Sequence, residues 1–156
     1  MDGADQPRAA GGGACVAIGA GGAAAGLRFA GYAALFDRID RGGDIVRPGA
    51  FARAIAEGRA VPLLWQHDPA RPIGTIERIA EDGRGLRVIG RITGASRTAR
   101  EAAAMLREGA VDGLSFGYRV RAAKQRTNRE LTDLDLVEVS LVTLPMQPRA
   151  RVHALD

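Results

Sequence analysis

Three short stretches of the 156-residue chain carry side chains that could do chemistry together. His67 ends an apolar run and is followed by Asp68-Pro69. The end of a strand beside a turn keeps a side chain accessible on a rigid support, and an imidazole takes up a proton near neutral pH. Ser115 stands between Gly113 and Gly117. Strand alternation puts these three on one face, so the glycines are expected to leave room around a nucleophilic hydroxyl.

The third stretch supplies an acid. Glu138 lies in the middle of a strand predicted from the mainly apolar residues 134–142, and burying an unpaired carboxylate is costly. It therefore needs a partner, for which an imidazolium is well suited. Asp133 and Asp135 are competitors for the same role. A hydroxyl, an imidazole and a carboxylate are the components of a Ser-His-acid triad.

Each of these side chains also has an ordinary structural interpretation. The histidine could be a surface residue bonded to Asp68, the serine could mark a close strand crossing, and Glu138 could pair with an arginine. The pattern G-x-S-x-G at residues 113–117 also suggests an α/β-hydrolase. A nucleophile elbow follows a strand and opens a helix, however, whereas Ser115 is expected to follow a helix and open a strand.

The composition excludes several other classes of protein. With Cys15 as the single cysteine and His67 and His153 as the only histidines, we expect no disulfide framework and no metal or other cofactor. The net charge of +4 comes from arginines scattered among acids, which argues against a nucleic-acid partner. The uncharged residues 9–27 are interrupted by glycines, which argues against a membrane span. Asp2 and Asp5 precede them against the single Arg8, so the positively charged start of a signal peptide is not expected.

The elements expected to position the site are mostly strands. Period-2 patterns and turn residues predict strands over residues 15–18, 27–36, 61–67, 73–79, 86–92, 114–120 and 134–144. Helices are predicted over 49–57 and 99–108, the second opened by a capping box of Thr98 and Glu101, and residues 122–132 are predicted to form a polar loop. The fold class is α+β, mainly β: a compact β-barrel of short strands surrounded by a few helices. We expect a flexible segment 1–26, one domain over 27–151 and a short tail 152–156.

The motifs in this order resemble those of the tailed-phage prohead proteases. The resemblance runs from about residue 27 to residue 151. The segments that match are Gly31-Tyr32-Ala33, residues 43–46 and 48–51, a histidine motif at 63–69 and 72–74, a serine motif at 108–118, and a closing strand and loop from 134 to 150.

The resemblance implies a serine endopeptidase with a fold similar to the herpesvirus assemblin protease. Such an enzyme cleaves scaffolding segments of the major capsid protein, and itself, within the immature capsid in the cytoplasm of the bacterial host. A second copy of the chain is a further potential partner. By resemblance, Ser115 is the nucleophile, His67 the general base and Glu138, in preference to Asp135, the acid, with loop 145–149 a candidate for binding the oxyanion. The alternative is a catalytically inactive capsid-assembly factor of the same fold, and the source would be a phage, a prophage or a gene transfer agent.

Overall fold

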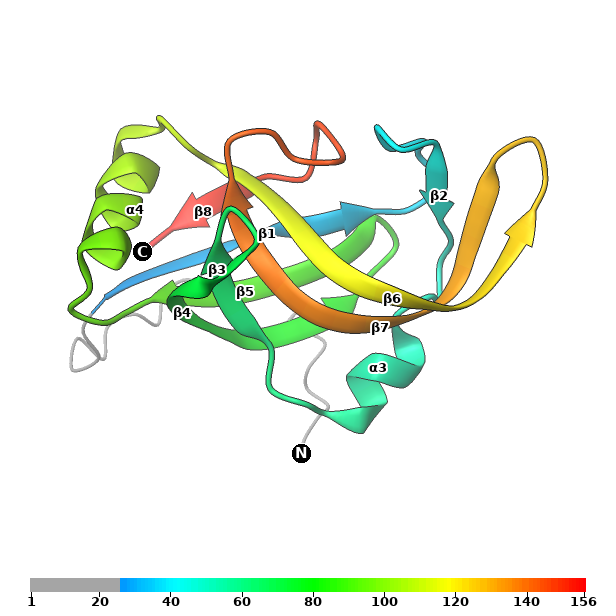
Figure 1. The fold of residues 1–156 in the computed structure, drawn as a ribbon, viewed down its shortest axis with the longest axis horizontal. Coiled ribbons are helices and arrows are strands. Elements are labelled where there is room, and N and C mark those ends of the chain that lie inside the picture. Colours follow the sequence, from blue (N-terminus) through cyan, green and yellow to red (C-terminus); the bar gives the residue numbers. More distant parts are fainter. Residues whose placement is uncertain (1–25) are drawn as a thin grey trace.

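Eight strands form one strongly curled sheet in the computed structural model, which describes residues 26–156 (Figure 1). The elements in chain order are β1 (Leu27–Leu35), β2 (Asp44–Val46), α3 (Ala52–Glu57), β3 (Pro62–Trp65), β4 (Asp68–Glu81), β5 (Gly85–Ile92), α4 (Arg97–Glu108), β6 (Gly113–Gln125), β7 (Arg129–Val142) and β8 (Val152–Leu155). The strand order is β2-β7-β3-β4-β5-β1-β8, with β6 paired to β7. The expected α+β, mainly β class is therefore confirmed.

Residues 150–152 draw the curled sheet towards a closed barrel. The amide of Leu114, at the start of β6, donates to the carbonyl of Ala150 at 2.8 Å. The amide of Tyr32, in β1, donates to the carbonyl of Arg151 at 3.2 Å. This segment therefore links β1 and β6 through main-chain hydrogen bonds, and β8 continues from it along β1.

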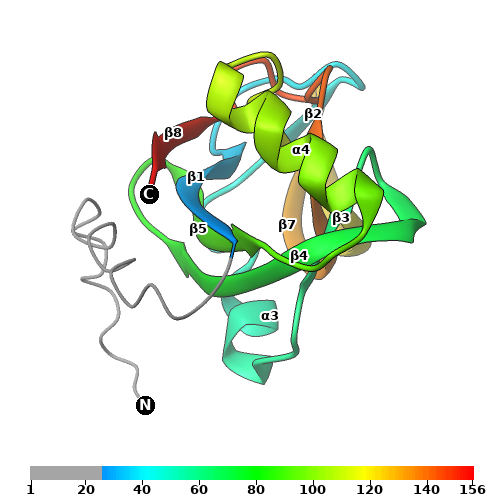
Figure 2. The same ribbon diagram turned by 90° about the vertical axis from the view of Figure 1, so that its left-hand side faces the viewer.

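The inward faces of the strands form the core, and the two helices lie at its margins. Phe51, just before α3, packs edge-on against Phe116 of β6 with ring centroids 5.3 Å apart. Helix α4 lies across one end of the sheet, as Figure 2 shows, and buries Ala99, Ala102 and Leu106. Its apolar side chains recur at helical spacing, which accounts for the correct prediction of this helix.

The predicted start of α4 is wrong. Its N-cap is Ser96, whose extended backbone lets the Oγ accept a hydrogen bond from the amide of Ala99 at 3.0 Å. Thr98 therefore lies inside the first turn, and Glu101 pairs with Arg97 at 3.1 Å instead of capping the helix. The error at the other helix has the opposite sign: α4 begins earlier than predicted, at Arg97, whereas the helix predicted over 49–57 begins later, at Ala52.

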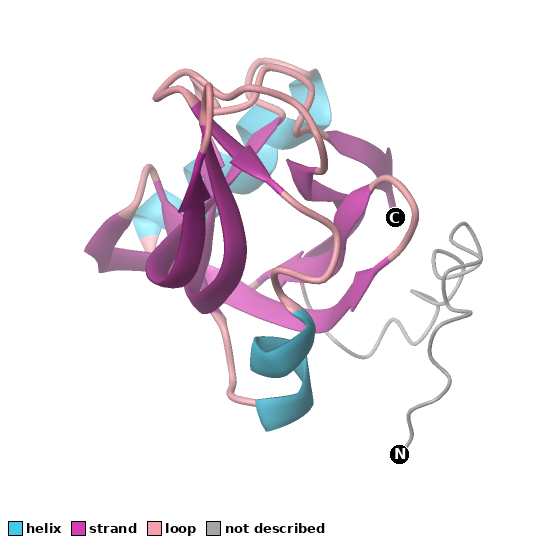
Figure 3. Cartoon of the chain, turned by 90° about the vertical axis from the view of Figure 1, so that its right-hand side faces the viewer, coloured by secondary structure: helices cyan, strands magenta, loops and turns pink. Residues whose placement is uncertain are grey.

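The predicted polar loop over residues 122–132 is also wrong. Strands β6 and β7 remain paired as far as Gln125 and Arg129. Together they form a ribbon that projects from the body of the sheet in Figure 1 and points towards the viewer in Figure 3. The residues of β6 in this ribbon, 119–125, are exposed, so polar side chains are compatible with strand structure here. The expected strand over 15–18 lies outside the described residues. Within residues 26–156, no helix has the length and apolar character needed to cross a membrane.

Candidate active site

Strand β7 organises the candidate site because it has strand partners on both edges. It pairs with β6 in antiparallel fashion, with Ser115 opposite Ser140 and Gly117 opposite Glu138. On its other edge it pairs in parallel with β3, which places Leu64 beside Ser140. Residues directly opposite each other in a sheet project from the same face. Ser115, Ser140 and Glu138 therefore share the face opposite the core.

A tight turn after β3 brings His67 onto this face. Gln66 and His67 have φ values of 51° and 61°, in the left-handed region that non-glycine residues rarely adopt. The amide of Gln66 donates to the carbonyl of Leu141 at 3.0 Å, and the amide of His67 donates to Ser140 Oγ at 3.1 Å. The turn is thus fastened to β7, and the imidazole reaches Glu138.

The imidazole and the carboxylate form a close pair. His67 Nδ1 lies 2.6 Å from Glu138 Oε2, and Ser140 Oγ donates to the other oxygen, Oε1, also at 2.6 Å. A carboxylate can only accept, so the proton of a neutral imidazole is on Nδ1 and Nε2 is left as an acceptor. The hydrogen bond to Glu138 raises the pKa of His67, although partial burial of the ring opposes this.

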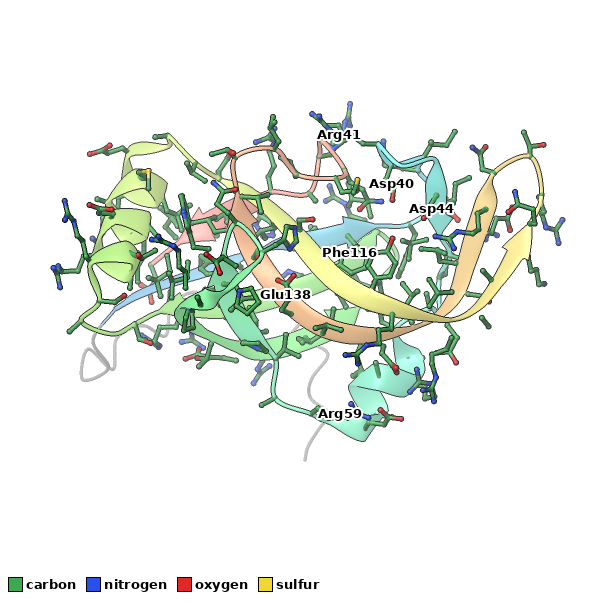
Figure 4. All side chains as sticks on the ribbon, viewed as in Figure 1. Asp40, Arg41, Asp44, Arg59, Phe116 and Glu138 are labelled. Carbon is green, nitrogen blue, oxygen red and sulfur yellow. The ribbon has the colours of Figure 1, made fainter. Side chains whose placement is uncertain are left out.

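Glu138 itself is well enclosed. Its side chain is 10% exposed, against 43% for that of His67. In Figure 4 its label lies near the place where β7 passes β3. The carboxylate has a partner at each oxygen, so the cost of its burial is offset by charge-assisted hydrogen bonds.

The glycines beside Ser115 make room for protein atoms. A Cβ on Gly117 would collide with Glu138 Oε2, and one on Gly113 would lie 2.7 Å from the carbonyl oxygen of Val142 and 2.9 Å from Pro145 Cδ. The Glu138 carboxylate therefore lies against Gly117, and the end of β7 and the loop after it lie against Gly113. The room that the two glycines leave is filled by these groups beside Ser115.

Ser115 lies on the same face as the His67–Glu138 pair and is 4% exposed. Its neighbour across the ladder is Ser140, which holds the carboxylate. Among the described residues, no hydrogen bond joins the Ser115 hydroxyl to the imidazole. The structure thus brings His67 and Glu138 into direct contact and places the serine on the adjacent strand.

The competing acids have other partners. Asp135 Oδ1 lies 2.7 Å from Arg53 Nη2, and this hydrogen bond lowers the pKa of Asp135. Asp133 pairs with the same arginine at 3.1 Å. Asp68, the alternative partner of His67, accepts from the amide of Ala70 at 2.9 Å. The imidazole is therefore bound by Glu138.

Sequence reasoning did not identify Ser140 or Gln66. Ser140 has a recognisable signal, because it follows Glu138 by two residues and so shares its strand face. Gln66 has none, since nothing in the sequence marks a non-glycine residue for a left-handed turn.

The family model described as caudovirus prohead serine protease matches residues 18–156. The chain belongs to this family. The prohead protease of Enterobacteria phage HK97 is 34% identical over 133 residues, which are 81% of this chain and 59% of that protein. The chain thus spans well under two thirds of the length of this family member.

Solved structures of viral proteases share the fold of this chain. The bacteriophage T4 capsid assembly protease superposes with a TM-score of 0.63 at 17% identity, covering 77% of this chain and 84% of that one. The varicella-zoster virus protease gives 0.60 at 18% identity, covering 85% and 64%. The Kaposi's sarcoma herpesvirus protease bound to a hexapeptide phosphonate inhibitor gives 0.59 at 15% identity, covering 85% and 65%. The expected assemblin-like barrel is therefore confirmed.

Proposed function

We propose that this chain is a serine endopeptidase of phage head maturation, with Ser115 as nucleophile, His67 as general base and Glu138 as the acid that orients the imidazole. The observation that carries the proposal is the 2.6 Å contact between His67 Nδ1 and Glu138 Oε2 on the strand next to Ser115. Membership of the prohead serine protease family supports the same reaction.

The mechanism follows from the atoms that remain available. His67 Nε2 accepts the proton of the Ser115 hydroxyl as Oγ attacks the carbonyl carbon of a peptide bond, and Glu138 stabilises the resulting imidazolium. The imidazolium then gives this proton to the leaving amine, and water hydrolyses the acyl-enzyme by the same route. Since catalytic hydrogen bonds often tighten only in the substrate complex, the bond between Ser115 and His67 is expected to form when a peptide covers the ring.

Backbone N–H groups must stabilise the oxyanion that forms during the attack. Loop 145–149 remains the candidate for this role. Pro145 packs against Gly113, two residues before Ser115, which supports a position near the attacked carbonyl.

The proposed substrate is a scaffolding segment of the major capsid protein, together with the chain itself, inside the immature capsid in the host cytoplasm. Support comes from the names of the similar proteins, which are a prohead protease and a capsid assembly protease. Self-association of the chain is part of the same proposal.

Co-expression with the capsid protein tests this function. The unaltered chain should shorten the capsid protein, and Ser115→Ala or His67→Ala should leave it at full length. A fluorophosphonate probe should label Ser115, as located by mass spectrometry. Capsid processing that persists in Ser115→Ala would contradict the proposal. If processing does not depend on Ser115 but head assembly still requires the chain, the protein is the inactive assembly factor.

A further inference from the structure

Ser140 touches both partners of the imidazole–carboxylate pair and is itself fully enclosed. Its exposed fraction is 0%. Its hydroxyl donates to Glu138 Oε1 at 2.6 Å and accepts from the main-chain amide of His67 at 3.1 Å. A hydroxyl has one proton to donate, and here that proton is directed at the carboxylate.

The turn that contains His67 depends on hydrogen bonds such as the one from its amide to Ser140. Left-handed backbone at two successive non-glycine residues persists only where the surroundings hold it in place. The side chain of Gln66 contributes a second fastening: its Oε1 accepts from the amide of Thr143 at 3.2 Å, and its Nε2 donates to Thr143 Oγ1 at 3.4 Å. Ser140 differs from this pair because it also contacts Glu138.

The carboxylate depends on Ser140 as well. Without the hydroxyl, Oε1 would lose the donor at 2.6 Å while its side chain stayed 10% exposed. A buried charged oxygen without a donor is unfavourable, so the carboxylate would rotate or move towards solvent. Either movement separates Oε2 from the imidazole.

We propose that Ser140 is a positioning residue for the proposed protease reaction, whose hydroxyl fixes the His67 turn and the Glu138 carboxylate in one geometry. It is not a second nucleophile, because its hydroxyl is enclosed and engaged on both sides. The kinetic part of this inference rests on the proposed function, whereas the structural part does not.

The first test is an NMR titration of the histidine Cε1–H signals in a Ser115→Ala background, which prevents self-cleavage. Adding Ser140→Ala should lower the pKa of His67 towards its ordinary value, because the contact with Glu138 loosens. His153 is an internal reference: burial lowers its pKa, and this value should not change. If Ser140→Ala does not fold, Ser140→Cys has a similar size with a weaker donor, and the same titration applies to it.

The second test is kinetic and uses Ser96→Ala as the matched control. Ser140→Ala should lower kcat by about 10- to 100-fold with little change in KM, as expected for a misplaced catalytic group. Ser96 caps α4, so its loss should reduce thermal stability and leave kcat and the pKa of His67 unchanged.

The outcomes separate the two proposals. A Ser140→Ala variant that matches Ser96→Ala in both kcat and the pKa of His67 overturns the positioning role and leaves the protease function standing. If the unaltered chain cleaves nothing but Ser140→Ala still lowers the pKa of His67, the positioning role holds and the protease function fails.

Discussion

The acid–base pair at the candidate site makes a prediction about pH. Glu138 raises the pKa of His67 above the ordinary 6.5, and only the neutral imidazole can act as a base. The rising limb of kcat/KM against pH should therefore have its midpoint above 6.5. In Glu138→Gln the negative charge is lost, so the limb should move to lower pH, while the plateau falls by on the order of 10²–10⁴-fold. A pH series on a peptide substrate measures both changes.

Asp135→Asn is the matched control for this variant. It removes the same charge three residues away, but from a carboxylate bound to Arg53. Its pH profile should superimpose on that of the unaltered chain. A limb that moves in Asp135→Asn and stays in Glu138→Gln would reverse the assignment of the acid.

Gly117 provides a steric test of the same pair. A Cβ at this position would collide with Glu138 Oε2, and the carboxylate can yield only by leaving His67. Gly117→Ala should therefore lower kcat by about 10-fold or more and lower the pKa of His67, with the fold preserved. Gly83→Ala is the control, since a Cβ there has no neighbour within 4 Å among the described residues. Equal kcat values for the two variants would contradict the prediction.

The candidate site could be predicted from the sequence only in part. His67, Ser115 and Glu138 stand out because each is a reactive or charged side chain in an apolar or glycine-rich setting. The geometry that joins them depends on a left-handed turn and on parallel pairing of β3 with β7. Neither feature has a recognisable local sequence pattern, because the pairing of a strand depends on contacts with segments that are distant in the sequence. The left-handed turn at Gln66 and His67 belongs to that hidden part.

At the scale of elements, periodicity located six of the eight strands but misjudged their lengths, and it missed the short strands β2 and β8. Alternation predicts a half-buried strand, so β6 and β7 were recognised where one face enters the core. Beyond Val120 and before Leu134, the ribbon has few buried side chains, and the alternation disappears although the pairing continues. A polar stretch therefore indicated exposure, and its interpretation as a loop was wrong.

The loop after β7 makes a prediction about stability. Gln147 is buried, and its side chain accepts from the amide of Leu35 at 2.6 Å and donates to the carbonyl of Leu35 at 2.9 Å. Gln147→Leu leaves both main-chain groups without these partners. The free energy of unfolding should fall by about 2–4 kcal/mol, measured by urea denaturation. Met146→Ala, at a 42% exposed neighbour, should cost much less. Equal losses in the two variants would show that the hydrogen bonds to Leu35 add little.

The whole molecule depends on how its curled sheet closes. The sheet is built largely from contacts between segments distant in sequence, with β1 paired to both β5 and β8. Three main-chain hydrogen bonds of residues 150–152 join β1 to the beginning of β6. Ala150 accepts from Leu114 of β6, Arg151 accepts from Tyr32 of β1, and the amide of Val152 donates at 2.8 Å to the carbonyl of Asp112, just before β6. Because Ser115 follows Leu114 directly, this closure also supports the strand that bears the proposed nucleophile.

A chain that ends at Arg149 tests this closure. It lacks the bridging residues and all of β8, and it leaves main-chain groups of Leu114 and Tyr32 without their partners. The loss of several buried hydrogen bonds should lower the free energy of unfolding by at least about 3 kcal/mol and broaden or abolish the cooperative thermal transition seen by circular dichroism. A chain shortened only by Leu155 and Asp156 keeps the bridge and should retain a cooperative transition. If both chains melt at the same temperature, the sheet holds its curvature without residues 150–152, and the link between barrel closure and the position of Ser115 must be abandoned.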